Sequence, residues 1–391
     1  MVAIPEPMNT TAAAIYALHE RRRVDDKPRL YLGVSELGEA CPRRLWLNFR
    51  KVDIESIEGR ILRLFDTGAR EELRVLQELR DLGMEVVGGQ HEVEACGGHL
   101  RGHMDAAVLG LVEAPATWHV VDVKTVKASK FRELQKNGAG KTFPKYAAQM
   151  QGYMGLTGME RAALIFVCKD TDEILIERLS FVKPEFDRLM ERGASIIFAA
   201  EPPPRISADE SWFECRFCPF HKHCHGVAAP MVNCRTCAHS TPREDGSWHC
   251  DHHDVPIPDE VQMVGCEEHR PIPALVESFL ELEGADGNVV RWRNKLNGAL
   301  VQQPDYSSQE IRNATDKAFL GDPFVAMMKG AFPGAKVVPS EPKPERGDAP
   351  RSDLGAIYGP AGTGANEGGD AKPASRARRG ARRVSDVPTV G

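Results

Sequence analysis

The spacing of apolar positions predicts helices and strands in alternation between residues 33 and 200. Helical periodicity predicts helices over 60–82 and 184–200, and a further helix that starts either at Glu36, after Ser35 as N-cap, or at Pro42. Alternating or continuous apolar runs predict strands at Met84–Val87, Gln90–Ala95, Leu100–Leu109, Trp118–Val126, Arg161–Asp170 and Glu173–Phe181. This order predicts an α/β fold whose mixed central sheet is flanked by helices.

The helix predicted at 60–82 carries one carboxylate on its apolar face. Phe65, Ala69, Leu76 and Leu79 form a stripe, and Glu72 falls in its middle. A buried carboxylate is expensive without a partner, so the pattern favours either a metal ligand or a side chain at the edge that reaches water. A glycine, at position 83, is expected to end the helix.

The stretch from Gly102 to Lys124 brings two acids and a lysine onto predicted strands. Residues two apart in a strand share a face, so Asp122 and Lys124 point the same way while Val123 faces the core. If the two strands pair, Asp105 joins them. Such a group suits a divalent cation held by oxygens, and an ordinary half-exposed hairpin is the alternative.

A basic segment and a helical pair follow these strands. Residues 127–145 contain six lysines and arginines and read as a mobile loop, suited either to phosphate contact or to solvent. Gln149 and Tyr153 then lie four apart on one helical face. They fit a structural hydrogen-bond pair, or a pair that reaches a catalytic lysine or a DNA phosphate.

Charge and hydropathy limit the class of protein. The net charge of −6 over 391 residues excludes a polycation, so a nucleic-acid partner needs a local basic patch. No apolar run is long enough to span a bilayer, and residues 1–11 do not resemble a signal peptide. We therefore expect a cytoplasmic protein with no membrane partner, where clustered cysteines bind metal more often than they form disulfides.

Eight of the ten cysteines fall into two sets, whereas Cys96 and Cys168 read as packing residues. The first set consists of Cys41, Cys215, Cys218 and Cys224. Three close thiolates need a fourth ligand, and Cys41 is the available one, so the site would staple two distant segments. Four thiolates suit a [4Fe–4S] cluster or Zn²⁺, and spacing does not separate the two.

The second set reads as a separate zinc site. It consists of Cys234, Cys237, Cys250 and Cys266. A CxxC pair with two later thiols is typical of tetrahedral Zn²⁺, and nearby histidines could replace one thiol. Because all four cysteines are available, an all-thiolate site is favoured, in a proline-rich segment held by metal rather than by a core.

The remaining chain is predicted to be less regular. Short helical stretches are expected at 276–335, with Ser307 as one helix start. Residues from about 336 are poor in large apolar side chains and are expected to be disordered, with a basic end that suits nucleic acid or solubility. The predicted divisions are 1–32, 33–228, 229–275, 276–335 and 336–391.

Taken together, these residues resemble the motifs of the PD-(D/E)XK nuclease superfamily, in its RecB-like exonuclease branch. The resemblance lies in Glu72, Asp105, the Asp122-Val123-Lys124 run and Gln149-x3-Tyr153, and it covers residue 33 to about 226. The first cysteine set resembles the iron–sulfur staple of CRISPR-associated RecB-like exonucleases and AddB-type nuclease domains. Residues 234–269 look like an appendage, as in a phage-type member.

Two positions depart from the pattern of that branch. Many RecB-like members carry a histidine near the position of Glu72, where this chain has Ala69 or Arg70. Many also carry Glu at the position of Asp122, although either carboxylate fits. The histidine that those members carry on this helix therefore has no counterpart here.

The resemblance implies a restriction-endonuclease-like core and a metal-dependent reaction. It implies that Asp105, Asp122, the Val123 carbonyl and Glu72 hold Mg²⁺ or Mn²⁺. Lys124 would orient or deprotonate water, or stabilise developing charge. Gln149 and Tyr153 would position the DNA strand or the lysine, and the [4Fe–4S] cluster would be structural.

The expected function is exonucleolytic hydrolysis of linear DNA at single-stranded or double-stranded ends. The expected setting is phage recombination, repair or replication in the host cytoplasm, alongside a recombination or single-strand-binding protein. The alternative is a non-catalytic DNA-binding or adaptor protein that retains the fold. An iron–sulfur redox carrier is disfavoured, because the cysteines flank a complete nuclease set.

Overall fold

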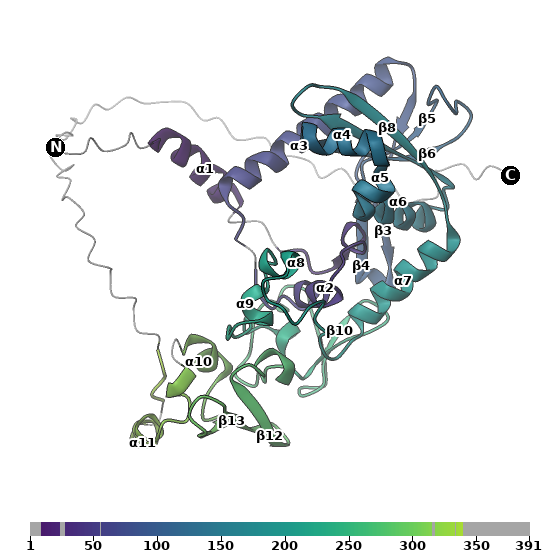
Figure 1. Ribbon diagram of the computed structural model, residues 1–391. Coiled ribbons are helices and arrows are strands. Elements are labelled where there is room, and N and C mark those ends of the chain that lie inside the picture. Colours follow the sequence, from purple (N-terminus) through teal and green to yellow (C-terminus); the bar gives the residue numbers. More distant parts are fainter. Residues whose placement is uncertain (1–8, 24–27, 55, 315–316, 333, 339–391) are drawn as a thin grey trace, which may run out of the picture. The chain divides into compact units, whose positions relative to one another are not determined.

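The computed structural model describes residues 9–23, 28–54, 56–314, 317–332 and 334–338. Figure 1 draws the order of elements, from α1 in purple to α11 in yellow-green. The basic end of the predicted disordered tail lies outside the described residues. Among the described helices, none combines the length and apolar content needed to cross a bilayer.

A five-stranded mixed sheet forms the centre of the fold, in the order β2-β5-β6-β7-β8. Its strands are β2 (Glu85–Val87), β5 (Ala106–Leu109), β6 (His119–Val126), β7 (Arg161–Cys168) and β8 (Ile174–Ser180). The β6–β7 pair is parallel and the other pairs are antiparallel. The predicted α/β class with a mixed central sheet is confirmed.

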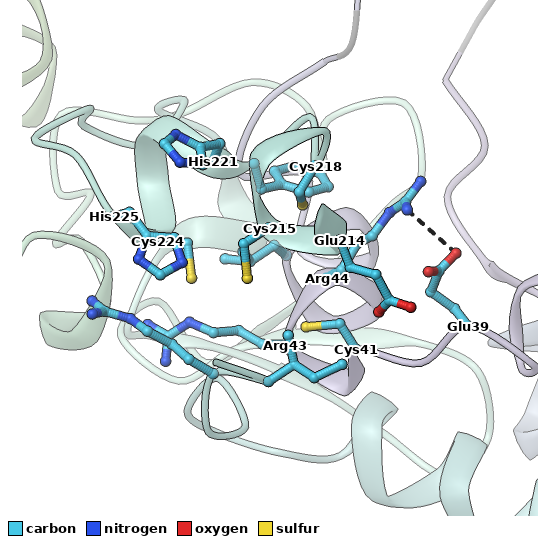
Figure 2. A pocket seen from close by; sticks show the side chains of 14 residues that line it. Glu39, Cys41, Arg43, Arg44, Glu214, Cys215, Cys218, His221, Cys224 and His225 are labelled. Atoms are coloured by element: carbon cyan, nitrogen blue, oxygen red, sulfur yellow. Dashed lines mark ion pairs between the residues drawn. The ribbon is translucent and has the colours of Figure 1, made fainter. Parts of the chain in front are cut away.

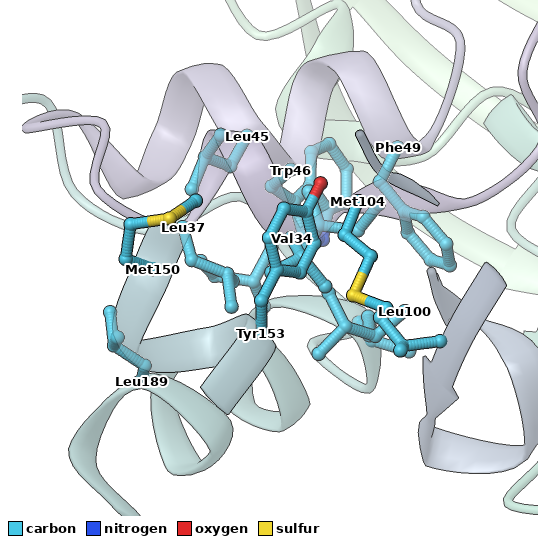
Figure 3. Packing of buried hydrophobic residues seen from close by; sticks show 14 of the residues in the cluster. Val34, Leu37, Leu45, Trp46, Phe49, Leu100, Met104, Met150, Tyr153 and Leu189 are labelled. Atoms are coloured by element: carbon cyan, nitrogen blue, oxygen red, sulfur yellow. The ribbon is translucent and has the colours of Figure 1, made fainter. Parts of the chain in front are cut away.

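Helices cover both faces of this sheet, as the nearly continuous burial along β6 requires. Val121 and Val123 pack with Val75, Leu76 and other residues of α3 (Gly59–Asp81). On the opposite face, Val120 and Val126 belong to one apolar cluster with Met150 and Tyr153 of α6 (Pro144–Thr157). Figure 3 shows the part of this cluster in which those two α6 residues lie near Val34, Leu37 and Leu100. Asp122 and Lys124 therefore face the α6 side, as the period-2 pattern predicted.

The other helices of residues 9–224 are short or pack around this core. They are α1 (Thr10–Arg23), α2 (Pro42–Phe49), α4 (Ala128–Asn137), α5 (Ala139–Thr142), α7 (Lys183–Ile197), α8 (Phe213–Arg216) and α9 (His221–Cys224). The second of the two predicted starts for α2 is confirmed, because Cys41 is its N-cap and Pro42 its first residue.

Two predictions, of a mobile loop after Val126 and of a long apolar stripe on α3, are wrong. Residues 128–142 form α4 and α5 rather than a mobile loop, because Phe131 and Leu134 bury against the core. On α3, Phe65 is 54% exposed and Ala69 is exposed as well, so only the second half of the predicted stripe faces the sheet. The helix ends at Asp81, and Gly83 adopts the left-handed conformation expected after a helix end.

The predicted strand Leu100–Leu109 is two strands in two different sheets. β4 (Leu100–Met104) pairs with β1 (Leu32–Gly33) and β3 (His91–Ala95), whereas β5 belongs to the central sheet. The chain changes sheet at Asp105. Buried residues stand on both sides of the break and no turn-forming Gly or Pro marks it, so the sequence pattern does not reveal it.

The cysteine-rich segment (residues 229–275) contains a sheet of β9 (Ser240–Pro242), β10 (Trp248–Cys250) and β11 (Val255–Ile257). Trp248, Ile257 and Ile272 belong to the same apolar cluster as α2 and β4. The expectation that metal replaces core here is therefore wrong. The boundary predicted at residue 229 stays a prediction.

Residues 276–338 hold a further apolar cluster around Phe279 and Trp292. Its strands are β12 (Leu280–Asp286), β13 (Val289–Asn294) and β14 (Leu300–Gln303), and its α-helices are α10 (Ser308–Asn313) and α11 (Pro323–Ala331). The prediction of short helices alone is wrong for 280–303, where three antiparallel strands form a sheet. Ser307 caps α10 as predicted.

Candidate active site

Asp122 and Lys124 lie on the same face of β6 and form an ion pair. Asp122 is 1% exposed, and its Oδ1 accepts a hydrogen bond of 3.0 Å from the Gln149 amide of α6. The Lys124 ammonium also lies 5.4 Å from the centre of the Tyr146 ring. Gln149 thus holds the Asp122 carboxylate, the Tyr146 ring contacts the Lys124 ammonium, and the ion pair joins the two groups.

Asp105 reaches the same place from the junction of the two sheets. Its Oδ2 accepts a hydrogen bond of 2.9 Å from the backbone N–H of Val123, the residue between Asp122 and Lys124. Asp105 lies in the bend between β4 and β5, so its side chain does not follow the alternating orientation of side chains in either strand. The two acids are therefore brought together by the β5–β6 pairing, in which Ala106 stands opposite Val121.

The charges of this group are unbalanced. Burial, and then the neighbouring Asp122 carboxylate, raise the pKa of Asp105 to about 7. Burial also raises the pKa of Asp122, against the opposing effect of Lys124. Burial alone would lower the pKa of Lys124, but the two carboxylates outweigh it and raise that pKa. Two buried acids with one cation leave room for additional positive charge.

A chain of hydrogen bonds fixes Asp122 from behind. The Gln149 amide nitrogen donates to Asp122 and also, at 3.3 Å, to the Tyr153 hydroxyl. That hydroxyl donates at 2.8 Å to the carbonyl of His103, two residues before Asp105. Burial raises the pKa of Tyr153 to about 12, so its hydroxyl stays neutral. The pair predicted at this spacing thus reaches Asp122 and the end of β4.

Glu72 stands at the margin of the group. It is half-buried on α3, and its charge contributes to the raised pKa of Asp105. Its Oε1 accepts a hydrogen bond of 3.0 Å from the side chain of Gln90. The structure therefore brings Glu72 toward the two aspartates without placing it among their direct partners.

Two neighbours of the site were not identified from the sequence. Gln90 has a φ of 58°, and its backbone N–H also donates to the Asp105 carbonyl at 3.4 Å, so it links Asp105 with Glu72. The pair Gly88-Gly89 directly before Gln90 is typical of a turn and is a sign that the sequence offers. Tyr146 lies one helical turn before Gln149, a spacing that could have drawn attention to it.

The first cysteine set lines one hollow of about 430 Å³, a volume that includes space open to solvent. Figure 2 shows the sulfurs of Cys41, Cys215 and Cys224 turned toward a common space beside Arg43. Burial raises the pKa of Cys224, and the Arg43 and Arg205 guanidinium groups oppose that rise. Cys41, the N-cap of α2, thus lines the same hollow as the three cysteines in and around α8 and α9, and the predicted staple stays a prediction.

The second cysteine set lines a smaller hollow of about 250 Å³. Burial, and then the other three thiols of the set, raise the pKa of Cys234 to about 11. All eight cysteines are free thiols, and the packing roles predicted for Cys96 and Cys168 are confirmed. Throughout the described ranges, no group of three or more His, Cys, Asp or Glu side chains is already arranged to hold a metal ion.

Comparison with known proteins identifies the family. A family model described as the PD-(D/E)XK nuclease superfamily matches residues 13–225. Similar solved structures include an alkaline exonuclease from Laribacter hongkongensis, 13% identical, with a TM-score of 0.33 over 46% of this chain and 90% of that one. Another is a phage-related exonuclease from Haemophilus somnus 129PT, 16% identical, with a TM-score of 0.32 over 42% of this chain and 91% of that one.

No curated protein matches the chain. The family match covers more than half of the sequence and includes the central sheet together with α3 and α6, which carry the group around Asp122. The chain therefore belongs to the PD-(D/E)XK nuclease superfamily.

Proposed function

We propose that this chain is a divalent-metal-dependent exonuclease that hydrolyses the phosphodiester bonds of linear DNA. The main support is the buried group of Asp105, Asp122 and Lys124, in which two acids share one cation. The proposal extends to single-stranded or double-stranded DNA ends as substrate. The phage recombination setting, its protein partners and the cytoplasmic location rest on the sequence resemblance.

The donor atoms of the group fit Mg²⁺ or Mn²⁺. We assign Asp105, Asp122, the carbonyl of Val123 and Glu72 as the residues that would hold the ion, because hard cations prefer oxygen ligands. A bound ion would polarise the scissile phosphate and lower the pKa of a water molecule. The excess negative charge of the two buried aspartates, seen in the raised pKa of Asp105, is what such an ion would neutralise.

Lys124 is assigned to charge stabilisation rather than to proton abstraction. The two carboxylates raise its pKa, so it carries a proton at neutral pH and is a poor base. An ammonium held beside the reacting phosphate would stabilise the negative charge that develops during cleavage. The ion pair with Asp122 and the Tyr146 ring hold it in place.

Gln149 and Tyr153 are assigned as positioning residues. Because Gln149 donates to Asp122 and Tyr153 donates to the His103 carbonyl, the two tie β6 to the end of β4. This arrangement supports a role in orienting Asp122 rather than in moving a proton, since Tyr153 is neutral.

The first cysteine set is proposed to hold a [4Fe–4S] cluster with a structural role. Four thiols line one hollow, and the donor set suits such a cluster. Arg43 and Arg205 lie close enough to the Cys224 thiol to favour its charged form, and a thiolate-bound cluster carries net negative charge. Joining Cys41 to α8 and α9 would close the domain on itself.

The test uses the full chain with end-labelled single-stranded, double-stranded and closed circular DNA. Linear DNA should be degraded from its ends with Mg²⁺ or Mn²⁺ and left intact with a chelator, and circular DNA should persist. Asp122→Asn and Lys124→Ala should each lower the rate at least about 100-fold, since each removes charge at the reacting phosphate.

Asp187→Asn is the matched control, because this exposed carboxylate of α7 pairs only with Lys183 among the described contacts. It should cleave like the unaltered chain. Binding of DNA ends without cleavage under either metal would instead support the non-catalytic DNA-binding alternative and overturn the proposed enzyme.

A further inference from the structure

We propose that the second cysteine set binds one zinc ion, and that this ion holds the cysteine-rich segment against the strand leading into Asp105. The ligands assigned are Cys234, Cys237, Cys250 and Cys266. This proposal holds whether or not the chain cleaves DNA, because it concerns a separate site and a packing role.

The four thiols come from three different places and converge on one hollow. Cys234 and Cys237 flank a single 3-10 turn (Cys234–Thr236), Cys250 ends β10, and Cys266 follows in the next loop. A CxxC turn with two later thiols is the donor set of tetrahedral zinc sites. One ion bound to all four thiols would tie these three pieces together.

Groups beside the second hollow favour a thiolate and a charged occupant. The backbone N–H of Arg270 points at the Cys237 sulfur at 3.5 Å, an arrangement that stabilises a thiolate. His269 is 2% exposed and lines the hollow, and its Nδ1 has no hydrogen-bond partner among the described residues. Its Nε2 is held by the Thr236 hydroxyl at 3.1 Å. A buried polar atom without a partner, on a residue that lines the hollow, supports a polar occupant there.

The four sulfurs that line this hollow are soft ligands, and Zn²⁺ prefers such a tetrahedral set. Zn²⁺ is the ion that four thiolates select without redox chemistry.

The turn between the first two ligands is anchored in the nuclease core. Arg235 is fully buried and donates to the carbonyls of Phe49 at 2.8 Å and Leu30 at 2.9 Å. Its guanidinium group lies 4.6 Å from the centre of the Phe49 ring and 4.4 Å from that of Trp248. A zinc ion that fixes the Cys234–Cys237 turn would therefore also fix the Arg235 side chain, which contacts Phe49 of α2 and Leu30, two residues before β1.

A second contact reaches β4 itself. The turn at Gly246 packs on the turn at Gly97 so closely that a Cβ atom on Gly246 would lie 1.9 Å from the Gly97 carbonyl oxygen. His99, the residue before β4, meets the carbonyl of Arg243 at 2.9 Å. β4 continues directly into Asp105. The segment thus braces the strand that positions one of the two site acids.

The experiment measures metal content and amide hydrogen exchange on the full chain purified without oxygen. The unaltered chain should hold about one zinc per chain. Cys237→Ser and Cys250→Ser should lose that zinc, keep their iron, and exchange faster across Leu100–Met104. Cys168→Ala, which alters a packing cysteine of β7, should keep the zinc.

Chelation of zinc from the unaltered chain covers the case in which a variant fails to fold. Removing the zinc should raise exchange across Leu100–Met104, and adding Zn²⁺ back should reverse the change. A chain without zinc, a Cys237→Ser variant that retains it, or zinc removal that leaves β4 exchange unchanged would each overturn the proposal. Loss of nuclease activity plays no part in these outcomes.

Discussion

Asp105 and Asp122 are acids in a place where water cannot screen them. Asp105 is 9% exposed and Asp122 is 1% exposed, and Lys124 forms an ion pair with Asp122. An ionised carboxylate in such a place is costly, so a proton competes with any cation for it. The protonation of these two aspartates therefore determines how metal binding depends on pH.

We predict that Mg²⁺ binding weakens as pH falls below about 7. The pKa of Asp105 rises from 3.8 to about 7 on folding, so between these values the folded, metal-free chain holds a proton that the unfolded chain has lost. Stability without metal should fall as pH rises through that window. Because the ion must displace this proton, affinity should drop about tenfold per pH unit below 7.

Thermal shift with Mg²⁺ between pH 5.5 and 8.5 measures this effect. The stabilisation by Mg²⁺ should grow with pH up to about 7 and then level off. Asp105→Asn, which cannot titrate, should show little stabilisation at any pH. A Mg²⁺ effect of equal size at pH 5.5 and 8.5 would show that Asp105 is not protonated as described.

The turn between β2 and β3 is the element that joins α3 to Asp105. Gln90 adopts a φ of 58°, a conformation that costs a residue with a side chain of the order of 1 kcal/mol. In that conformation its amide reaches Glu72 while its backbone reaches Asp105. This strained conformation supports a positioning role for Gln90, since it lets one residue contact both Glu72 and Asp105.

We predict that Gln90→Ala raises the Mg²⁺ concentration needed for half-maximal cleavage by about 10-fold, with little change in rate at saturating Mg²⁺. Without the amide, Glu72 is no longer directed toward Asp105. Gln90→Gly should share this metal defect although it relieves the backbone strain. If Gln90→Gly instead restores the normal Mg²⁺ requirement, the backbone conformation matters and the amide does not.

At the scale of the whole molecule, the first cysteine set joins parts of the chain that are far apart in sequence. Cys41 begins α2, and the other three cysteines lie in and around α8 and α9. The match to the nuclease family ends at residue 225, directly after the last of these thiols. A metal cluster at this point would close the family domain.

We predict that the chain purified without oxygen is brown and holds about four iron atoms in the first set. Cys41→Ala and Cys218→Ala should each lose this iron and unfold at lower temperature, because both remove a ligand of the same cluster. Cys96→Ala should keep the iron. A colourless chain that holds only zinc in these thiols would contradict the cluster.

Much of the fold follows from patterns along single elements. The period of two along residues 119–126 predicts that Asp122 and Lys124 share a face, and the structure agrees. The helical spacing of Gln149 and Tyr153 predicts their contact. The basic residues after Val126 led to the wrong prediction of a loop, because they outnumber Phe131 and Leu134, the two apolar side chains that pack α4 against the core.

By itself, the sequence determined which side chains lie on a common face, because periodicity within one strand or helix is a local property of the backbone. Only the tertiary structure decided that the strand to Leu109 breaks at Asp105, that Gln149 meets Asp122, and that Gln90 meets Glu72. Those contacts join separate elements. Their partners depend on how sheets and helices pack, which no spacing along the chain records.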